Sequence, residues 1–155
     1  MSWRLPTVGE YCTLKFSRNA AEVLETARKI AGELPKIGDF RRFYTEYIKW
    51  VDGIRAADPL LQIPYYPEYE AEKRYFHCNS WELKTVADYT GLNFNEISEL
   101  MITQFWAWLR DGFIFNCEKS EKGLEYLEKA YYNSQTDSDR EAFRELKGAT
   151  GNGIK

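Results

Sequence analysis

Groups that carry covalent or metal chemistry are scarce in this sequence. Its 155 residues include three cysteines and one histidine. Cys12, Cys78 and Cys117 are odd in number and widely spaced, and no CxxC pair occurs, so the chain has no disulfide framework. A zinc site needs several ligands at matched spacings, and His77 beside Cys78 does not supply them. We therefore expect no disulfide, no metal and no cofactor.

The patterns of known catalytic sites are missing too. The serines lack a nucleophile elbow of the GxSxG type. The glycine-rich stretch at 148–153 lacks the lysine and the following helix of a phosphate loop. Carboxylate pairs at helical spacing, such as Glu125 with Glu128, are typical of solvated helix faces. We predict no catalytic residues and a function that is not enzymatic.

Long apolar runs are also missing. No stretch reaches the roughly 18 uncharged apolar residues of a membrane helix. Residues 1–6 lack the apolar run of a signal peptide, so we expect a cytoplasmic protein with no membrane contact. The net charge of −3 argues against nucleic acid as the main partner, because phosphates are matched by clustered lysine and arginine.

Aromatic residues, by contrast, are plentiful. Nine Phe, eleven Tyr and five Trp make up 16% of the chain, and we expect some of them on the surface. Trp106 and Trp108 lie about 200° apart on a helix, so both cannot face one small core. Tryptophan and tyrosine are favoured anchors of protein interfaces. The predicted partner-binding residues are Trp106 or Trp108, with Tyr65, Tyr66 and Tyr69.

Apolar residues recur at helical spacing along most of the chain. This pattern predicts an all-α, compact bundle of five to six helices, with one domain over 1–148, a Tyr/Pro-rich linker at 58–78 and a flexible tail at 149–155. Residues 1–16 are predicted to form an extended arm or a short strand, because Pro6 and Gly9 interrupt them.

The boundaries of the helices follow from caps and breakers. Helices are expected over about 19–34, 39–57 and 81–89, then as one long helix from 93 past 109, with others starting at Ser120 and Ser138. Asn79 with Glu82, and Asn93 with Glu96, have the spacing of a capping box. The spacing leaves open whether the long helix continues through Gly112. In the helix after Ser120, the residues expected to face inward are Leu124, Leu127 and Tyr131.

A second hypothesis is a helix-turn-helix DNA-binding regulator over 81–101. Ala87, Gly91 and Ile97 have the spacing of the small residue, turn glycine and buried aliphatic of that motif. The second helix carries two carboxylates and no cation, which is unfavourable beside phosphates. The residues expected to reach DNA are Lys84, Asn93, Asn95 and Ser98.

Part of the C-terminal half resembles small phage and prophage proteins of the tail assembly chaperone type. The resemblance covers roughly 97–148 and lies in LRDGFIFN (109–116), SEKGLEYL (120–127) and QTDSDR (135–140), followed by a glycine-rich tail. It implies a helical protein in a bacterial host that holds an aggregation-prone phage polypeptide before assembly. A phage-encoded inhibitor of a host protein is the remaining alternative, because it too would use an interface without chemistry.

Overall fold

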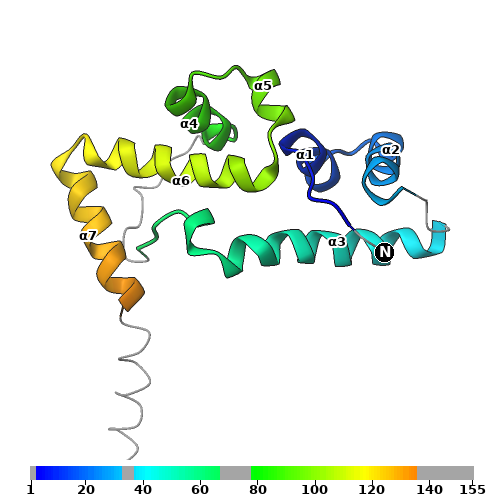
Figure 1. Ribbon diagram of the computed structural model, residues 1–155, viewed down its shortest axis with the longest axis horizontal. Helices are drawn as coiled ribbons and strands as arrows, with labels where there is room; N and C mark the ends of the chain where they lie inside the picture. Colours follow the sequence, from blue (N-terminus) through cyan, green and yellow to red (C-terminus); the bar gives the residue numbers. More distant parts are fainter. Residues whose placement is uncertain (1–2, 33–36, 67–77, 136–155) are drawn as a thin grey trace, which may run out of the picture. The chain divides into compact units, whose positions relative to one another are not determined.

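The computed structural model describes residues 3–32, 37–66 and 78–135. These residues form seven α-helices and one short 3₁₀ helix, so the prediction of an all-α fold is confirmed, with one helix more than expected (Figure 1). The sequence predicted one domain, whereas the chain groups into two compact units. Unit 1 consists of Met1–Ile63 and Cys78–Phe113, and unit 2 consists of Pro64–His77 and Ile114–Lys155. The helix expected after Ser138 and the tail lie outside the described residues.

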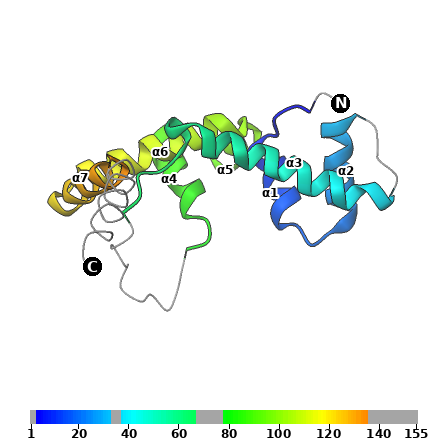
Figure 2. The same ribbon diagram turned by 90° about the horizontal axis from the view of Figure 1, so that it is seen from below.

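Most of the helices belong to unit 1. They are α1 (Val8–Phe16), α2 (Ala20–Ala31), α3 (Ile37–Ala57), the 3₁₀ helix η1 (Pro59–Leu61), α4 (Trp81–Thr90), α5 (Phe94–Glu99) and the first part of α6 (Ile102–Glu118). Unit 2 holds the end of α6 and α7 (Glu121–Gln135). Helices α1 and α2 lie next to each other in Figures 1 and 2, and Figure 1 shows both on one side of α3. Within the described ranges, no helix is both long and apolar enough to cross a membrane.

The N-terminal segment differs from its prediction, because most of it is helical. Residues 8–16 form α1, which Thr7 and Glu10 start with a capping box. The Glu10 N–H donates to Thr7 Oγ1 at 3.3 Å, and the Thr7 N–H donates to Glu10 Oε2 at 3.0 Å. This reciprocal cap and one buried apolar face outweigh the β-type residue content that suggested a strand. The buried side chains of α1 are Val8, Tyr11 and Leu14.

The single long helix expected from residue 93 is divided in two. Helix α5 ends at Glu99, and α6 begins at Ile102. Backbone groups between the two helices form hydrogen bonds with the N-terminal segment. The Val8 N–H donates to the Leu100 carbonyl at 2.8 Å, and the Ile102 N–H donates to the Pro6 carbonyl at 3.0 Å. Thr7 and Met101 pair there as an isolated antiparallel bridge. Beyond this break, α6 runs unbroken through Gly112.

Two of the predicted helix caps are present, and one is not. Asn93 and Glu96 form the expected capping box, and the Gly123 N–H donates to Ser120 Oγ at 3.1 Å at the start of α7. The cap predicted at Asn79 is wrong, because Ser80 is the N-cap residue of α4 and makes no side-chain capping hydrogen bond. Helix α4 is therefore held by the burial of its apolar face rather than by its cap.

The core of unit 1 explains the wide apolar face of α3. Trp3 covers that face, with its ring centroid 6.0 Å from Phe43 and 5.8 Å from both Tyr47 and Trp50. The Tyr47 hydroxyl donates to the Arg4 carbonyl at 2.9 Å, and burial raises the pKa of this phenol. The most completely buried large side chains of the core are Tyr47, Val51, Val86, Ile97, Ile102, Trp106 and Leu109.

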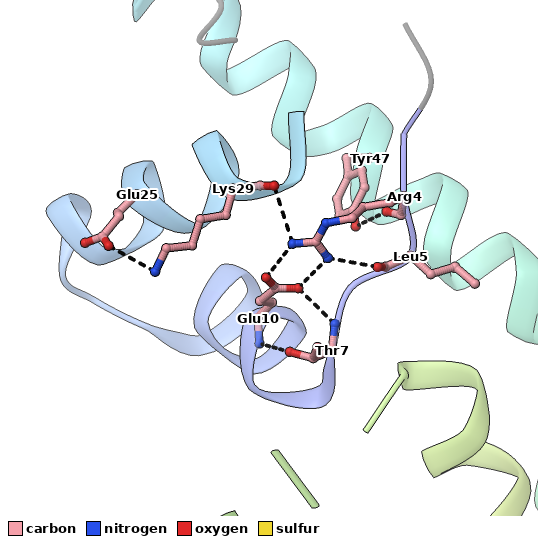
Figure 3. A network of polar contacts seen from close by, with 7 residues as sticks. All are labelled: Arg4, Leu5, Thr7, Glu10, Glu25, Lys29 and Tyr47. Atoms are coloured by element: carbon pink, nitrogen blue, oxygen red, sulfur yellow. Dashed lines mark hydrogen bonds and ion pairs between the residues drawn. The ribbon is translucent and has the colours of Figure 1, made fainter. Parts of the chain in front are cut away.

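An ion-pair network joins the N-terminal segment to α1 and α2 (Figure 3). The Arg4 guanidinium donates to both carboxylate oxygens of Glu10, at 2.8 and 2.6 Å, and to the Lys29 carbonyl at 3.4 Å. The hydrogen bond from Arg4 lowers the pKa of Glu10, and the Thr7 N–H lowers it further, although partial burial opposes both. The ionised form of Glu10 is therefore favoured in the folded protein.

We expect Glu10→Gln to destabilise unit 1 by about 1–2 kcal/mol at neutral pH, through loss of the cap and the ion pair. Because the folded pKa of Glu10 is lowered, the stabilisation is complete above the usual carboxyl pKa of 4.5 and is lost as pH falls through the lower folded value. Urea denaturation at pH 7 and pH 3 measures both effects. We expect the difference in unfolding free energy between the unchanged chain and the Glu10→Gln variant to be smaller at pH 3. Glu25→Gln is the control, since Glu25 forms only an exposed pair with Lys29. Equal losses for the two variants would contradict a special role for Glu10.

Candidate functional site

The described part of unit 2 leaves most of its large apolar side chains uncovered. Within residues 64–66 and 114–135, Ala130 is the one buried residue. The exposed large side chains and their exposed fractions are Tyr65 at 68%, Phe115 at 49%, Leu124 at 52%, Tyr131 at 61% and Tyr132 at 59%. Exposed apolar groups gathered in one region mark interaction sites more often than groups scattered singly.

Three of these residues form what we call the α7 surface: Leu124, Tyr131 and Tyr132. At about 100° of rotation per residue, they lie within roughly 100° of one another around the helix. The rings of Tyr131 and Tyr132 meet edge to face with centroids 5.7 Å apart. Glu128 lies on the same side of the helix and is exposed, so the α7 surface combines apolar rings with a carboxylate.

The sequence predicted that Leu124 and Tyr131 face inward, and the structure corrects this. Gly123 lies directly against the Cys117 backbone, and Ala130, seven residues later, falls on the same face of α7. That face is the covered one, so Leu124 and Tyr131 point away from it. Leu127, the third residue expected to face inward, is half-buried.

The two described tyrosines of the Tyr/Pro-rich segment lie beside α7. The Tyr126 hydroxyl donates to the Pro64 carbonyl at 3.1 Å and accepts from the Tyr66 N–H at 3.3 Å. Lys129 Nζ lies 5.9 Å from the centre of the Tyr66 ring. Tyr66 is consequently half-buried, while Tyr65 stays exposed. Tyr69 lies outside the described residues.

The prediction that Trp106 is an exposed partner contact is wrong. Its side chain is 2% exposed and meets the Tyr11 ring edge-on, with centroids 5.6 Å apart. Trp108 is half-buried and packs against the same core. Both indoles are accommodated because the first part of α6 shares a core with residues of α1, α3, α4 and α5.

The helix pair α4–α5 has the expected turn. Gly91 has a left-handed backbone, with φ of 78°, and Ile97 is fully buried. The polar groups proposed for DNA are largely engaged within the pair. Asn93 caps α5, the Ser98 hydroxyl donates to the Asn95 carbonyl at 2.6 Å, and Lys84 pairs with Asp88. The Asn95 side chain is exposed, and α5 carries no cation, so DNA binding stays a prediction without added support.

Two of the three thiols, those of Cys12 and Cys117, are poorly suited to nucleophilic chemistry, whereas Cys78 is exposed. Burial raises the pKa of Cys12, with a smaller contribution from the nearby Glu82 charge, and burial also raises the pKa of Cys117. A raised pKa keeps a thiol protonated, and the thiolate is the nucleophile. In the described ranges, no three His, Cys, Asp or Glu side chains gather as metal ligands; His77 lies outside those ranges.

Comparisons with models of protein families, with curated proteins and with solved structures found no match. The fold and the uncovered surface of unit 2 define an all-α protein with an exposed aromatic face. The likeness to tail assembly chaperones stays a prediction.

Proposed function

We propose that this chain is a non-catalytic protein-binding factor that uses the α7 surface to bury an apolar segment of a partner. The supporting observation is that Leu124, Tyr131 and Tyr132 are all more than half exposed on one side of a helix. Tyrosine suits such a role because its ring supplies contact area while its hydroxyl keeps a polar end. The raised pKa of Cys12 and Cys117 also fits a role without covalent chemistry.

A tail assembly chaperone is the most concrete form of this function. Exposed aromatic rings interleaved with carboxylates, such as Glu128, can cover an apolar polypeptide while the acidic groups keep the complex in solution. A phage inhibitor of a host protein would use the same surface. The identity of the partner separates the two forms of the proposal.

The test is affinity capture from lysate of phage-infected cells, with Tyr131→Ser/Tyr132→Ser as the variant. We expect the unchanged chain to capture a phage structural polypeptide, and the double variant to bind it at least about tenfold more weakly. Phe16→Ser is the matched control, because Phe16 is 69% exposed but lies on α1 in unit 1. Recovery of a host enzyme would favour the inhibitor. Equal capture by all three proteins would exclude the α7 surface.

A further inference from the structure

Unit 1 contains a cavity of about 470 Å³ between α1, α3, the start of α4 and α6. Small-molecule sites in proteins have volumes of about 300–1,000 Å³. The cavity has an apolar wall, to which Val8, Leu83, Ile102, Phe105 and Trp106 contribute. The charged side chains that line it are Lys15, Arg55 and Glu82.

The charge of Lys15 is already compensated. Its Nζ lies 3.2 Å from Asp52 Oδ2 and donates to the Tyr11 hydroxyl at 2.6 Å. That hydroxyl in turn donates to Asp52 Oδ1 at 2.6 Å. Burial raises the pKa of Tyr11, and the hydrogen bond to Asp52 raises it further, so the phenol stays neutral at physiological pH. Lys15, Tyr11 and Asp52 thus satisfy one another at the side of the cavity.

Arg55 has no such counter-charge among the residues that the structure describes. Its guanidinium carbon lies 5.1 Å from the centre of the Trp106 ring, and its Nε donates to the Leu61 carbonyl at 3.3 Å. An arginine has five N–H donors in one plane. Stacking on an aromatic face leaves the edge of that plane open to a carboxylate. Arg55 therefore brings an unused, directional anion-binding edge to an aromatic wall.

Glu82 brings an uncompensated charge of the opposite sign. It lines the same cavity from α4 and is half-buried, and it forms no ion pair with any described residue. Arg55 and Glu82 do not pair with each other, although both line one cavity. The cavity therefore presents two half-buried charges of opposite sign, and neither is paired with a described residue.

We propose that this cavity binds a small zwitterion with an apolar body, in its simplest form a free amino acid with an aromatic or branched aliphatic side chain. Its carboxylate accepts hydrogen bonds from Arg55, its ammonium group donates to Glu82, and its side chain packs against Phe105 and Trp106. A simple anion would be repelled by Glu82, and a simple cation would be repelled by Arg55. A ligand that carries both charges compensates both residues. The proposed binding site is independent of the α7 surface.

The first experiment compares ligands on the unchanged full-length chain by isothermal titration calorimetry. L-Phenylalanine and L-leucine test the class, while 3-phenylpropionate lacks the ammonium group and phenethylamine lacks the carboxylate. We expect phenylalanine to bind and each truncated analogue to bind at least about tenfold more weakly, since each loses one charge-assisted hydrogen bond. An analogue that binds as tightly as phenylalanine would overturn the zwitterion assignment. Failure of both amino acids to bind at millimolar concentration would overturn the site.

The second experiment assigns each charge to its residue. Arg55→Gln should weaken phenylalanine binding at least about tenfold, and it should strengthen phenethylamine binding because it removes a like charge. Glu82→Gln should weaken phenylalanine binding by as much and should strengthen 3-phenylpropionate binding for the same reason. Lys49→Gln is the matched control, because Lys49 is an exposed cation on α3 that does not line the cavity. Misfolding would weaken all ligands together, and circular dichroism would detect it. If neither substitution changes the ranking of the ligands, these residues do not hold the charges.

Discussion

Gly123→Ala is expected to disrupt the turn between α6 and α7. A Cβ atom at position 123 would collide with the Cys117 carbonyl oxygen and would lie 2.6 Å from the Cys117 carbonyl carbon. These contacts are with backbone, which cannot rotate away as a flexible side chain can. We expect a loss of about 3 kcal/mol in the stability of α7, at the upper end of overpacking effects. Hydrogen exchange of the amides in 121–135 measures this loss directly.

Gly53→Ala is the matched control for that substitution. Gly53 lies within α3, and nothing outside the helix would come within 4 Å of an added Cβ. Alanine is about 1 kcal/mol better than glycine in a helix interior, so this variant should be more stable. If Gly123→Ala lowers stability while Gly53→Ala raises it, the loss at position 123 is due to the close approach at Cys117 and not to helix propensity. Protection of the α7 amides in Gly123→Ala as strong as in the unchanged chain would contradict the close approach.

Trp106→Ala is expected to destabilise unit 1 by about 3–5 kcal/mol. The indole is almost completely buried, and its loss would leave a void beside Tyr11 and remove the aromatic face on which Arg55 stacks. Measured stabilities of small domains are about 5–15 kcal/mol, so this one change would remove a large share. Urea denaturation followed by circular dichroism measures the loss.

Trp81→Ala tests whether burial, rather than the tryptophan itself, sets the size of that effect. Trp81 is 42% exposed at the start of α4, and we expect its replacement to cost less than half as much as that of Trp106. A similar loss at both positions would show that Trp106 is not packed as described. The comparison also bears on binding, since a buried indole cannot act as an interface anchor without unfolding.

The helices that the sequence predicted well are those with periodic apolar residues and local end signals. Asn93 with Glu96 marks the start of α5, and Gly91 marks the end of α4. The same reasoning could have found α1, because Thr7 with Glu10 has the spacing of a capping box. Pro6 and Gly9, which usually interrupt helices, lie beside and within that signal and favoured an extended segment instead. The break at 100–101 had no local signal, since it is set by hydrogen bonds to residues more than ninety positions earlier.

The candidate sites were harder to predict, because they too depend on which parts of the chain pack together. The rotation between Trp106 and Trp108 showed that they point in different directions, but not which side of α6 is covered. In α7, the contact of Gly123 with Cys117 decides which face is buried, and periodicity alone favoured the other face. The cavity draws its lining from four separate stretches of chain, so Arg55 and Glu82 resemble ordinary helix-surface residues in the sequence.

The backbone pairing of Pro6 and Val8 with residues 100–102 has a consequence for synthesis of the protein. A ribosome makes residues 1–63 well before it releases Ile97, Ile102 and Phe105, which complete the core with α1 and α3. Contacts between such distant positions form slowly, and the incomplete core exposes apolar surface in the meantime. The nascent chain therefore passes through a stage in which its early helices lack their packing partners, and unit 1 closes only when α6 has emerged.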